Sequence, residues 1–178
     1  MHINTKGVFF EECFASLLLT RILTPFSTGF VDMQSPAGVG ISGVIYNYDG
    51  NVYVSDEARM LASMGDNKFL MGNVHEKSYE ELFNSDFLHF LINSSCLECL
   101  PECAECAFQS YCGADPVRNY SEQGDIIGNK NTSEICRRNK AIIKYFLELI
   151  KQNSKDIQDV FWSWITRRPL EETKSKST

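Results

Sequence analysis

The 178-residue sequence contains no long run of charges of one sign and no apolar stretch as long as a membrane helix. Its 17 Lys and Arg and 23 Asp and Glu are interspersed, with a formal net charge of −6, which argues against a nucleic-acid partner. The apolar segment FASLLLTRIL is interrupted by Arg21 and follows Glu11 and Glu12. It fits neither a signal peptide nor a span of roughly 20 apolar residues. We therefore expect a cytoplasmic protein with neither a nucleic-acid nor a membrane partner.

The sequence also lacks an internal repeat and an even number of cysteines. Its seven cysteines, in a chain without a secretory signal, make a disulfide framework a poor explanation, because reducing compartments keep thiols free. Five of them fall in CLECLPECAECAFQSYCG, residues 96–113. This segment is rich in turns and has no helical or strand periodicity. It therefore needs a crosslink, which metal ligation would supply.

Apolar spacing and turn residues predict one α+β domain with appended segments. The clearest signal is a β-hairpin at residues 41–55, ISGVIYNYDGNVYVS, where Asp49-Gly50 suits a tight turn. An apolar stripe predicts a long helix over residues 132–152, with Asn131 and Glu134 as its capping residues. Further helices are expected at 7–23, ended by Pro25, at 79–91 as one or two short pieces, and at 157–167, with a short extended segment at 69–74.

Four cysteines have the spacing of metal ligands. The two-residue spacer between Cys103 and Cys106 lets both thiolates face one metal or cluster from a single turn. Cys112 follows after five residues, and Cys136 lies 24 positions further on, in the first turn of the predicted long helix. Four thiolates from two separate segments are able to ligate a cubane iron–sulfur cluster, which is an anionic centre.

The start of the long helix favours an anionic centre. A ligand in the first helical turn benefits from free N–H groups and from the positive end of the helix dipole. Arg137 and Arg138 follow Cys136 directly and are expected to add positive charge.

Two other readings use the same cysteines. A zinc site with four thiolates is satisfied by Cys96-x2-Cys99 and Cys103-x2-Cys106, although the three-residue linker between the pairs is unusually short. The spacing Cys99-x3-Cys103-x2-Cys106 matches the catalytic motif of radical S-adenosylmethionine enzymes. That motif normally has an aromatic residue where Glu105 stands, and too few residues follow it here to build a barrel.

The hairpin, the C-x2-C-x5-C spacing and the late cysteine resemble the SPASM, or auxiliary-cluster, domain of radical S-adenosylmethionine peptide-modifying enzymes. The resemblance runs from about residue 43 to residue 149. In that family the hairpin precedes C-x2-C-x5-C-x3-C and one last cysteine. Cys103, Cys106 and Cys112 are similar to the first three motif positions and Cys136 to the last. The resemblance implies that these four hold one auxiliary [4Fe-4S] cluster.

Two departures from the family pattern reduce the expected number of auxiliary clusters. Pro116 stands where the family has its fourth motif cysteine, and Ser55 stands where the hairpin should end in G-x4-C. Both missing thiolates belong, in the family, to the other auxiliary cluster, so one cluster is expected and not two. The segments YNYDGNVYVSDEARML, FLMGNV and CAFQSYCGADPVRNY look most like the maturases of the His-Xaa-Ser peptide-modification system.

The resemblance implies that the chain takes part in radical modification of a peptide after translation. S-adenosylmethionine and a second [4Fe-4S] cluster are expected only in a catalytic barrel preceding residue 1, so this chain carries no catalytic residue and is not active alone. Its cluster serves either as an electron relay or as a structural element near the peptide. The expected partners are a peptide substrate and either a radical S-adenosylmethionine catalytic domain or a partner maturase.

The expected organisation has four parts. These are a helix and linker left from the end of a barrel at 1–40, the SPASM-like domain at 41–153, a C-terminal helix at 154–170 and a disordered tail at 171–178. Cys96 and Cys99 lie outside the mapped ligands, either as further metal ligands or as plain thiols. Cys13 is expected in the core. His2, His75 and His89 lack ligand spacing.

Overall fold

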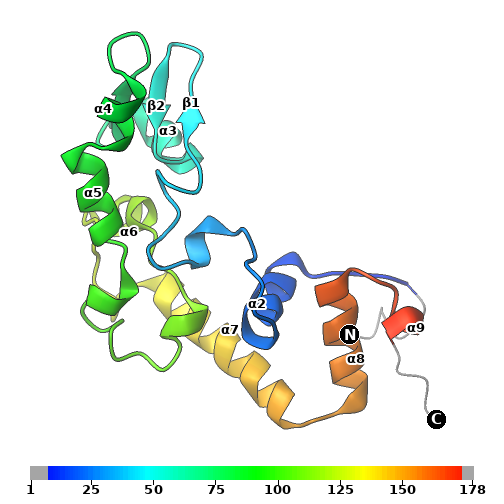
Figure 1. Ribbon diagram of the computed structural model, residues 1–178. Coiled ribbons are helices and arrows are strands. Elements are labelled where there is room, and N and C mark those ends of the chain that lie inside the picture. Colours follow the sequence, from blue (N-terminus) through cyan, green and yellow to red (C-terminus); the bar gives the residue numbers. More distant parts are fainter. Residues whose placement is uncertain (1–7, 174–178) are drawn as a thin grey trace. The chain divides into compact units, whose positions relative to one another are not determined.

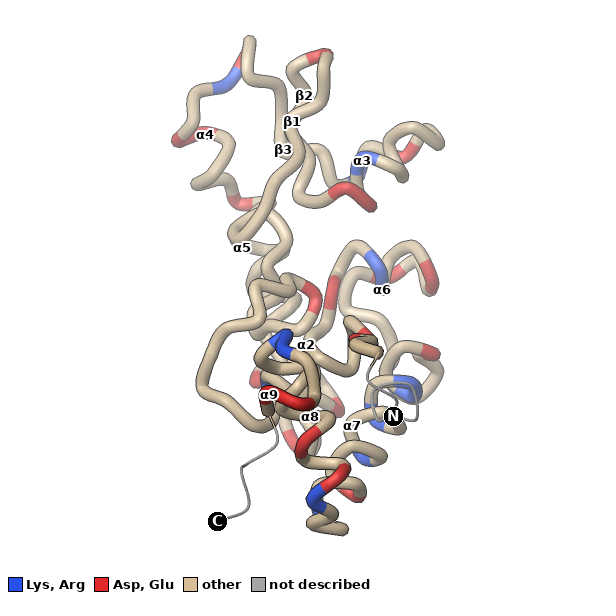
Figure 2. Tube along the Cα trace, turned by 90° about the vertical axis from the view of Figure 1, so that its right-hand side faces the viewer, with Lys and Arg blue, Asp and Glu red and all other residues tan. Residues whose placement is uncertain are grey.

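The computed structural model describes residues 8–173, which form two compact units (Figure 1). The central unit comprises residues 30–137, and the terminal unit joins residues 8–29 to residues 138–173. The secondary structure is mixed α+β, as predicted. Basic and acidic residues are interspersed along the chain (Figure 2). Among the described residues no helix combines the length and the apolarity needed to cross a membrane.

The central unit contains a three-stranded antiparallel sheet. Strands β1 (Ile45–Tyr46), β2 (Asn51–Tyr53) and β3 (Leu70–Asn73) pair in the order β1-β2-β3. Gly50 adopts φ +83° in the turn between β1 and β2, a conformation that favours glycine. The carboxylate of Asp49 accepts a hydrogen bond of 3.0 Å from the main-chain amide of Asn51. The predicted hairpin is confirmed as β1 and β2, and the predicted extended segment forms β3, the third strand of the sheet.

Short helices surround this sheet, and most begin at a capping side chain. Ser55, Ser78 and Ser85 each accept a hydrogen bond from a main-chain amide in the first turn of the helix that follows. The one or two short helices expected at residues 79–91 are present as two helices. The helical elements before the long helix are the 3-10 turn η1 (Val31–Met33), α3 (Asp56–Ser63), α4 (Tyr79–Phe83), α5 (Asp86–Asn93) and α6 (Pro116–Gln123).

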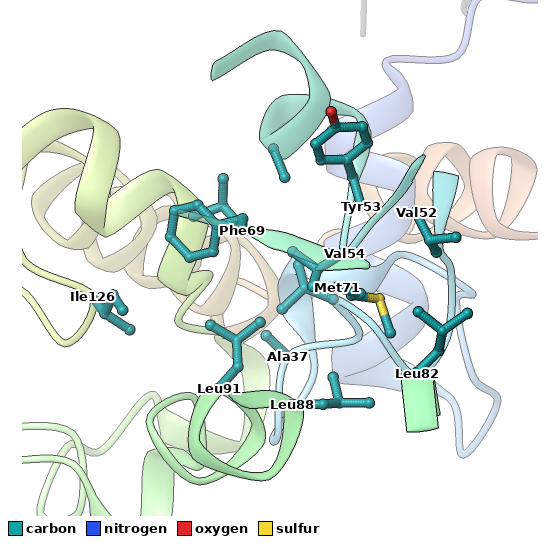
Figure 3. Packing of buried hydrophobic residues seen from close by; sticks show 13 residues of the cluster. Ala37, Val52, Tyr53, Val54, Phe69, Met71, Leu82, Leu88, Leu91 and Ile126 are labelled. Carbon is teal, nitrogen blue, oxygen red and sulfur yellow. The ribbon is translucent and has the colours of Figure 1, made fainter. Parts of the chain in front are cut away.

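The core of the central unit gathers side chains from the sheet, from α5 and from the segment around α6 (Figure 3). Phe69 is 1% exposed and meets Tyr120 edge to face, with 5.4 Å between ring centroids. The Tyr120 hydroxyl donates a hydrogen bond of 2.7 Å to Asp66. Phe69 therefore links the strand side of the core to the helix that follows the cysteine segment.

The terminal unit is helical. Its elements are α2 (Cys13–Leu23), the larger part of α7 (Glu134–Lys151), α8 (Lys155–Thr166) and α9 (Leu170–Thr173). Helices α2 and α8 pack together, and the hydroxyl of Ser16 donates to the carbonyl of Trp164 at 3.2 Å. The indole N–H of Trp164 donates to the carbonyl of Phe10 at 2.6 Å. Trp164 is buried and Trp162 is exposed.

Three expectations for this unit are wrong. Helix α2 begins at Cys13 and not at residue 7, because Glu12 caps it by accepting from the amide of Ala15 at 2.6 Å. Cys13 is exposed, since the buried side of the helix starts at Ala15. Residues 171–173, expected in a disordered tail, belong to α9, whose Leu170 is buried. The rest of that tail lies outside the described residues.

Replacement of Phe69 by alanine tests the core. Because the ring is almost fully buried, Phe69→Ala is expected to lower the free energy of unfolding by about 3–5 kcal/mol. Tyr48→Ala is the matched control, since Tyr48 is 99% exposed and its loss is expected to cost less than ~0.5 kcal/mol. Urea denaturation followed by circular dichroism measures both, and equal losses would contradict the described core.

Candidate metal centre

The cysteine segment is built from consecutive tight turns. The main-chain amides of Cys99, Cys106 and Cys112 donate to carbonyls three residues earlier at 3.0–3.1 Å, and the amide of Cys103 donates to Leu100 at 3.2 Å. Two of these turns are 3-10 helices, η2 (Leu97–Cys99) and η3 (Gln109–Tyr111). Repeated three-residue turns explain why the segment shows neither helical nor strand periodicity.

A small apolar cluster holds the segment in place. Leu97, Leu100 and Ala114 are buried together, and the partly buried Cys103 and Cys112 pack against them. The cluster is separate from the larger core around Phe69. Burial of these three side chains thus positions two of the four predicted ligands.

Gly113 allows a close backbone approach directly after Cys112. A Cβ atom at this position would lie 1.9 Å from the carbonyl oxygen of Asp32 in η1. Because the obstructing atom belongs to the main chain, a side chain at position 113 requires the backbone to move. Glycine is therefore required where the cysteine turns meet η1.

A hydrogen bond between side chains connects the cysteine turns to the loop before α7. The amide of Asn131 donates to the carboxylate of Glu102, which itself has a left-handed φ of +66°. The prediction that Asn131 caps the long helix is therefore wrong. Ser133 takes this role, because its hydroxyl accepts a hydrogen bond of 3.2 Å from the amide of Cys136. Cys136 lies in the first turn of α7, as predicted.

The four predicted ligands share one electrostatic neighbourhood. Burial raises the pKa of the Cys103 thiol, and the neighbouring groups Cys112, Cys136 and Cys106 raise the pKa further. The ammonium of Lys130 acts in the opposite direction and lowers the pKa of Cys103. Thiols from two segments that are distant in sequence are thus brought near one another.

The thiols lie near one another without forming a ligation geometry. Within residues 8–173, no group of three or more His, Cys, Asp or Glu side chains is arranged to hold a metal ion. Coulombic interactions extend well beyond the length of a metal–thiolate bond, which is about 2.3 Å for zinc. Ligation of a single metal ion therefore requires that these thiols lose their protons and be drawn together.

Cys96 and Cys99 form a second pair in the turn η2. Cys99 is exposed and Cys96 is partly exposed. The thiol of Cys96 donates to the carboxylate of Glu98 at 3.4 Å. This hydrogen bond is the main cause of the raised pKa of Cys96, followed by burial and by the charges of Glu98 and Cys99.

The positive charge expected from the two arginines after Cys136 is exposed to solvent. The side chain of Arg137 is 75% exposed and pairs with Glu134, and the guanidinium of Arg138 lies 5.8 Å from the ring centroid of Phe14. Lys130, by contrast, is only 8% exposed. Sequence reasoning missed this residue, and the sequence contains no signal that marks a lysine in a polar loop as buried.

Sequence reasoning also missed helix α6 and its cap. Asp115 is buried, and its carboxylate accepts a hydrogen bond of 2.8 Å from the amide of Val117. The signal was present, since Asp115-Pro116 has a preferred N-cap residue followed by proline at the start of a helix. Asp32 lies close by and forms an ion pair of 3.2 Å with Arg118.

Burial raises the pKa of Asp115 to about 6. The charge of Asp32 raises it as well, whereas hydrogen bonds from two main-chain amides and the charge of Arg118 lower it. Burial likewise raises the pKa of Asp32 itself, against the effect of Arg118.

The two positions that depart from the family pattern have clear local roles. Ser55 caps α3 through a hydrogen bond of 3.2 Å from the amide of Ala58. Pro116 begins α6, where its missing N–H costs nothing. His75 and His89 belong to no metal-binding group of the described residues, and His2 lies outside them.

Scans of the sequence against family models, curated proteins and solved structures find no match.

Replacement of Asp115 by asparagine tests the buried carboxylate. The folded pKa lies above the unfolded value, so the native state binds the extra proton and its stability falls as pH rises from about 4 to about 6. At pH 7 the ionised carboxylate costs about 3 kcal/mol. Asp115→Asn keeps the capping oxygen, so its stability relative to the wild type should increase from pH 4 to pH 7, as measured by urea denaturation under reducing conditions.

Asp49→Asn is the control of opposite sign. Hydrogen bonds, chiefly from the amide of Asn51, lower the pKa of Asp49, so its ionised form stabilises the native state and this contribution is lost in acid. The asparagine variant should therefore be less stable than the wild type at pH 7 and approach it at low pH. Parallel pH profiles of stability for the wild type and Asp115→Asn would contradict the raised pKa of Asp115.

Proposed function

We propose that Cys103, Cys106, Cys112 and Cys136 hold one [4Fe-4S] cluster, and that the chain is the auxiliary-cluster domain of a radical S-adenosylmethionine enzyme that modifies a peptide. The observation that carries the proposal is the contact between the two cysteine-bearing segments: the side chain of Asn131 donates to Glu102, which directly precedes Cys103. The charges of Cys106, Cys112 and Cys136 also act on the Cys103 thiol. The spacing of the cysteines in the sequence points to the same four thiols.

The donor set fits a cubane cluster. All four candidate donors are sulfur atoms, each partly exposed, and each lies in a tight turn or in the first turn of a helix. In a cubane each thiolate binds a different iron atom. The four cysteine sulfur atoms are therefore farther apart than the four around a single zinc ion. Thiols that gather without closing on one point are compatible with this wider arrangement.

In this proposal the chain's own residues bind the cluster and hold its cysteine ligands in position. When bound, the cluster supplies one-electron transfer or a crosslink between the cysteine turns and α7. Leu97 and Leu100 hold the turns, and the hydroxyl of Ser133 accepts a hydrogen bond from the main-chain amide of Cys136. The modified peptide, S-adenosylmethionine and the catalytic cluster belong to the proposed enzyme as a whole, and abstraction of hydrogen is assigned to its catalytic barrel.

Anaerobic reconstitution with ferrous iron and sulfide tests the cluster. We expect brown protein with broad visible absorption and about four irons per chain. Colourless protein that takes up stoichiometric zinc and no iron would contradict the proposal and support a zinc-stabilised interaction module. Iron and zinc are quantified by elemental analysis of the same preparations.

Cysteine variants test the ligand assignment. Cys103→Ala and Cys136→Ala are each expected to lose most of the bound iron, because either change removes one of four ligands. Cys13→Ala, which changes an exposed thiol of the terminal unit, and the double variant Cys96→Ala with Cys99→Ala should keep it. Iron loss in the double variant, with retention in Cys136→Ala, would move the site to the other cysteines.

A further inference from the structure

Lys130 is a buried cation beside the candidate metal centre. The residue is 8% exposed, and its ammonium donates a hydrogen bond to the carbonyl of Ile127. Lysine is almost never buried to this extent without a compensating partner. A single main-chain carbonyl is a neutral acceptor, so the burial of this charge needs a further explanation.

The geometry places Lys130 next to the cysteine turns. The residue after it, Asn131, forms the side-chain hydrogen bond to Glu102, and Cys103 follows Glu102 directly. This contact brings the loop before α7 to the turn that carries Cys103. The effect of the Lys130 charge on Cys103 is consistent with the same arrangement.

Arg137, the cation next to Cys136 in sequence, is screened by solvent. Arg137 adjoins Cys136 in sequence, but its side chain is 75% exposed and is paired with Glu134. Exposed charges are screened by water and salt, whereas a buried charge acts through a lower effective dielectric constant. Of these two cations, Lys130 therefore has the stronger influence on an anionic centre at the four thiols.

We propose that Lys130 tunes the cluster by raising its reduction potential. This inference rests on the proposed function. The oxidised cluster with its four thiolates accepts one electron and gains one negative charge. A buried ammonium stabilises the more negative, reduced form, so that reduction becomes easier. The arrangement suits a cluster that accepts electrons, and thus favours the electron-relay role over a purely structural one.

Redox titration of the reconstituted protein tests this role. Wild type, Lys130→Met, Lys130→Arg and Arg137→Met are reduced stepwise with dithionite in the presence of mediators, and the reduced cluster is followed by electron paramagnetic resonance. Lys130→Met should shift the midpoint potential to more negative values. Lys130→Arg, which keeps the charge, should stay close to the wild type.

Arg137→Met is the matched control. It removes the same unit of charge next to a ligand, but from an exposed side chain, so its shift should be clearly smaller than that of Lys130→Met. Equal shifts in these two variants, or the same downward shift in Lys130→Arg as in Lys130→Met, would overturn the tuning role.

Iron content separates the two proposals. If the wild type and all variants bind about four irons and the potential of Lys130→Met is unchanged, the tuning role is wrong and the cluster stands. If the wild type itself takes up no cluster, the proposed function fails and the tuning role fails with it. If only Lys130→Met fails to load, Lys130→Gln, which also removes the charge, takes its place in the titration: a shift to more negative potential, larger than that of Arg137→Met, supports the tuning role, and an unchanged potential overturns it.

Discussion

The hydrogen bond between Asn131 and Glu102 joins two segments on which the candidate metal centre depends. One segment carries three of the predicted ligands in consecutive turns, and the other leads into α7 and Cys136. Isolated turns of this kind lose much conformational entropy on ordering, so they need contacts that fix them. The buried Leu97 and Leu100 anchor the turns from the other side. These contacts tie the turns that carry Cys103 and Cys112 to the loop that contains the buried Lys130 and leads to Cys136.

Local signals predicted those elements whose formation depends on local chemistry. Asp49-Gly50 predicted the hairpin, because a tight turn with positive φ needs such residues. The long helix was predicted from its apolar stripe, but its start was misplaced, since the amide of Asn131 is used in a tertiary contact. Helix α6 was missed although Asp115-Pro116 marked its start, because the surrounding residues are polar. The exposure of Cys13 depends on where α2 begins, which its apolar spacing does not determine.

Of the candidate site, only the cysteine residues could be proposed from the sequence. Cysteine spacing selected four thiols, because ligand geometry imposes spacing on the chain. The charges around them follow from burial, which spacing does not reveal. Arg137 adjoins a predicted ligand in sequence and yet is exposed, whereas Lys130, six positions before Cys136, is buried. The buried carboxylate of Asp115 likewise depends on the approach of η1.

The close approach of Gly113 to Asp32 has a consequence for the entropy of ligand binding. A peptide unit packed against another backbone has few alternative conformations, so the main chain beside Cys112 is restricted in the protein itself. If the proposed cluster is bound through Cys112, this part of the main chain would have little conformational freedom left to lose.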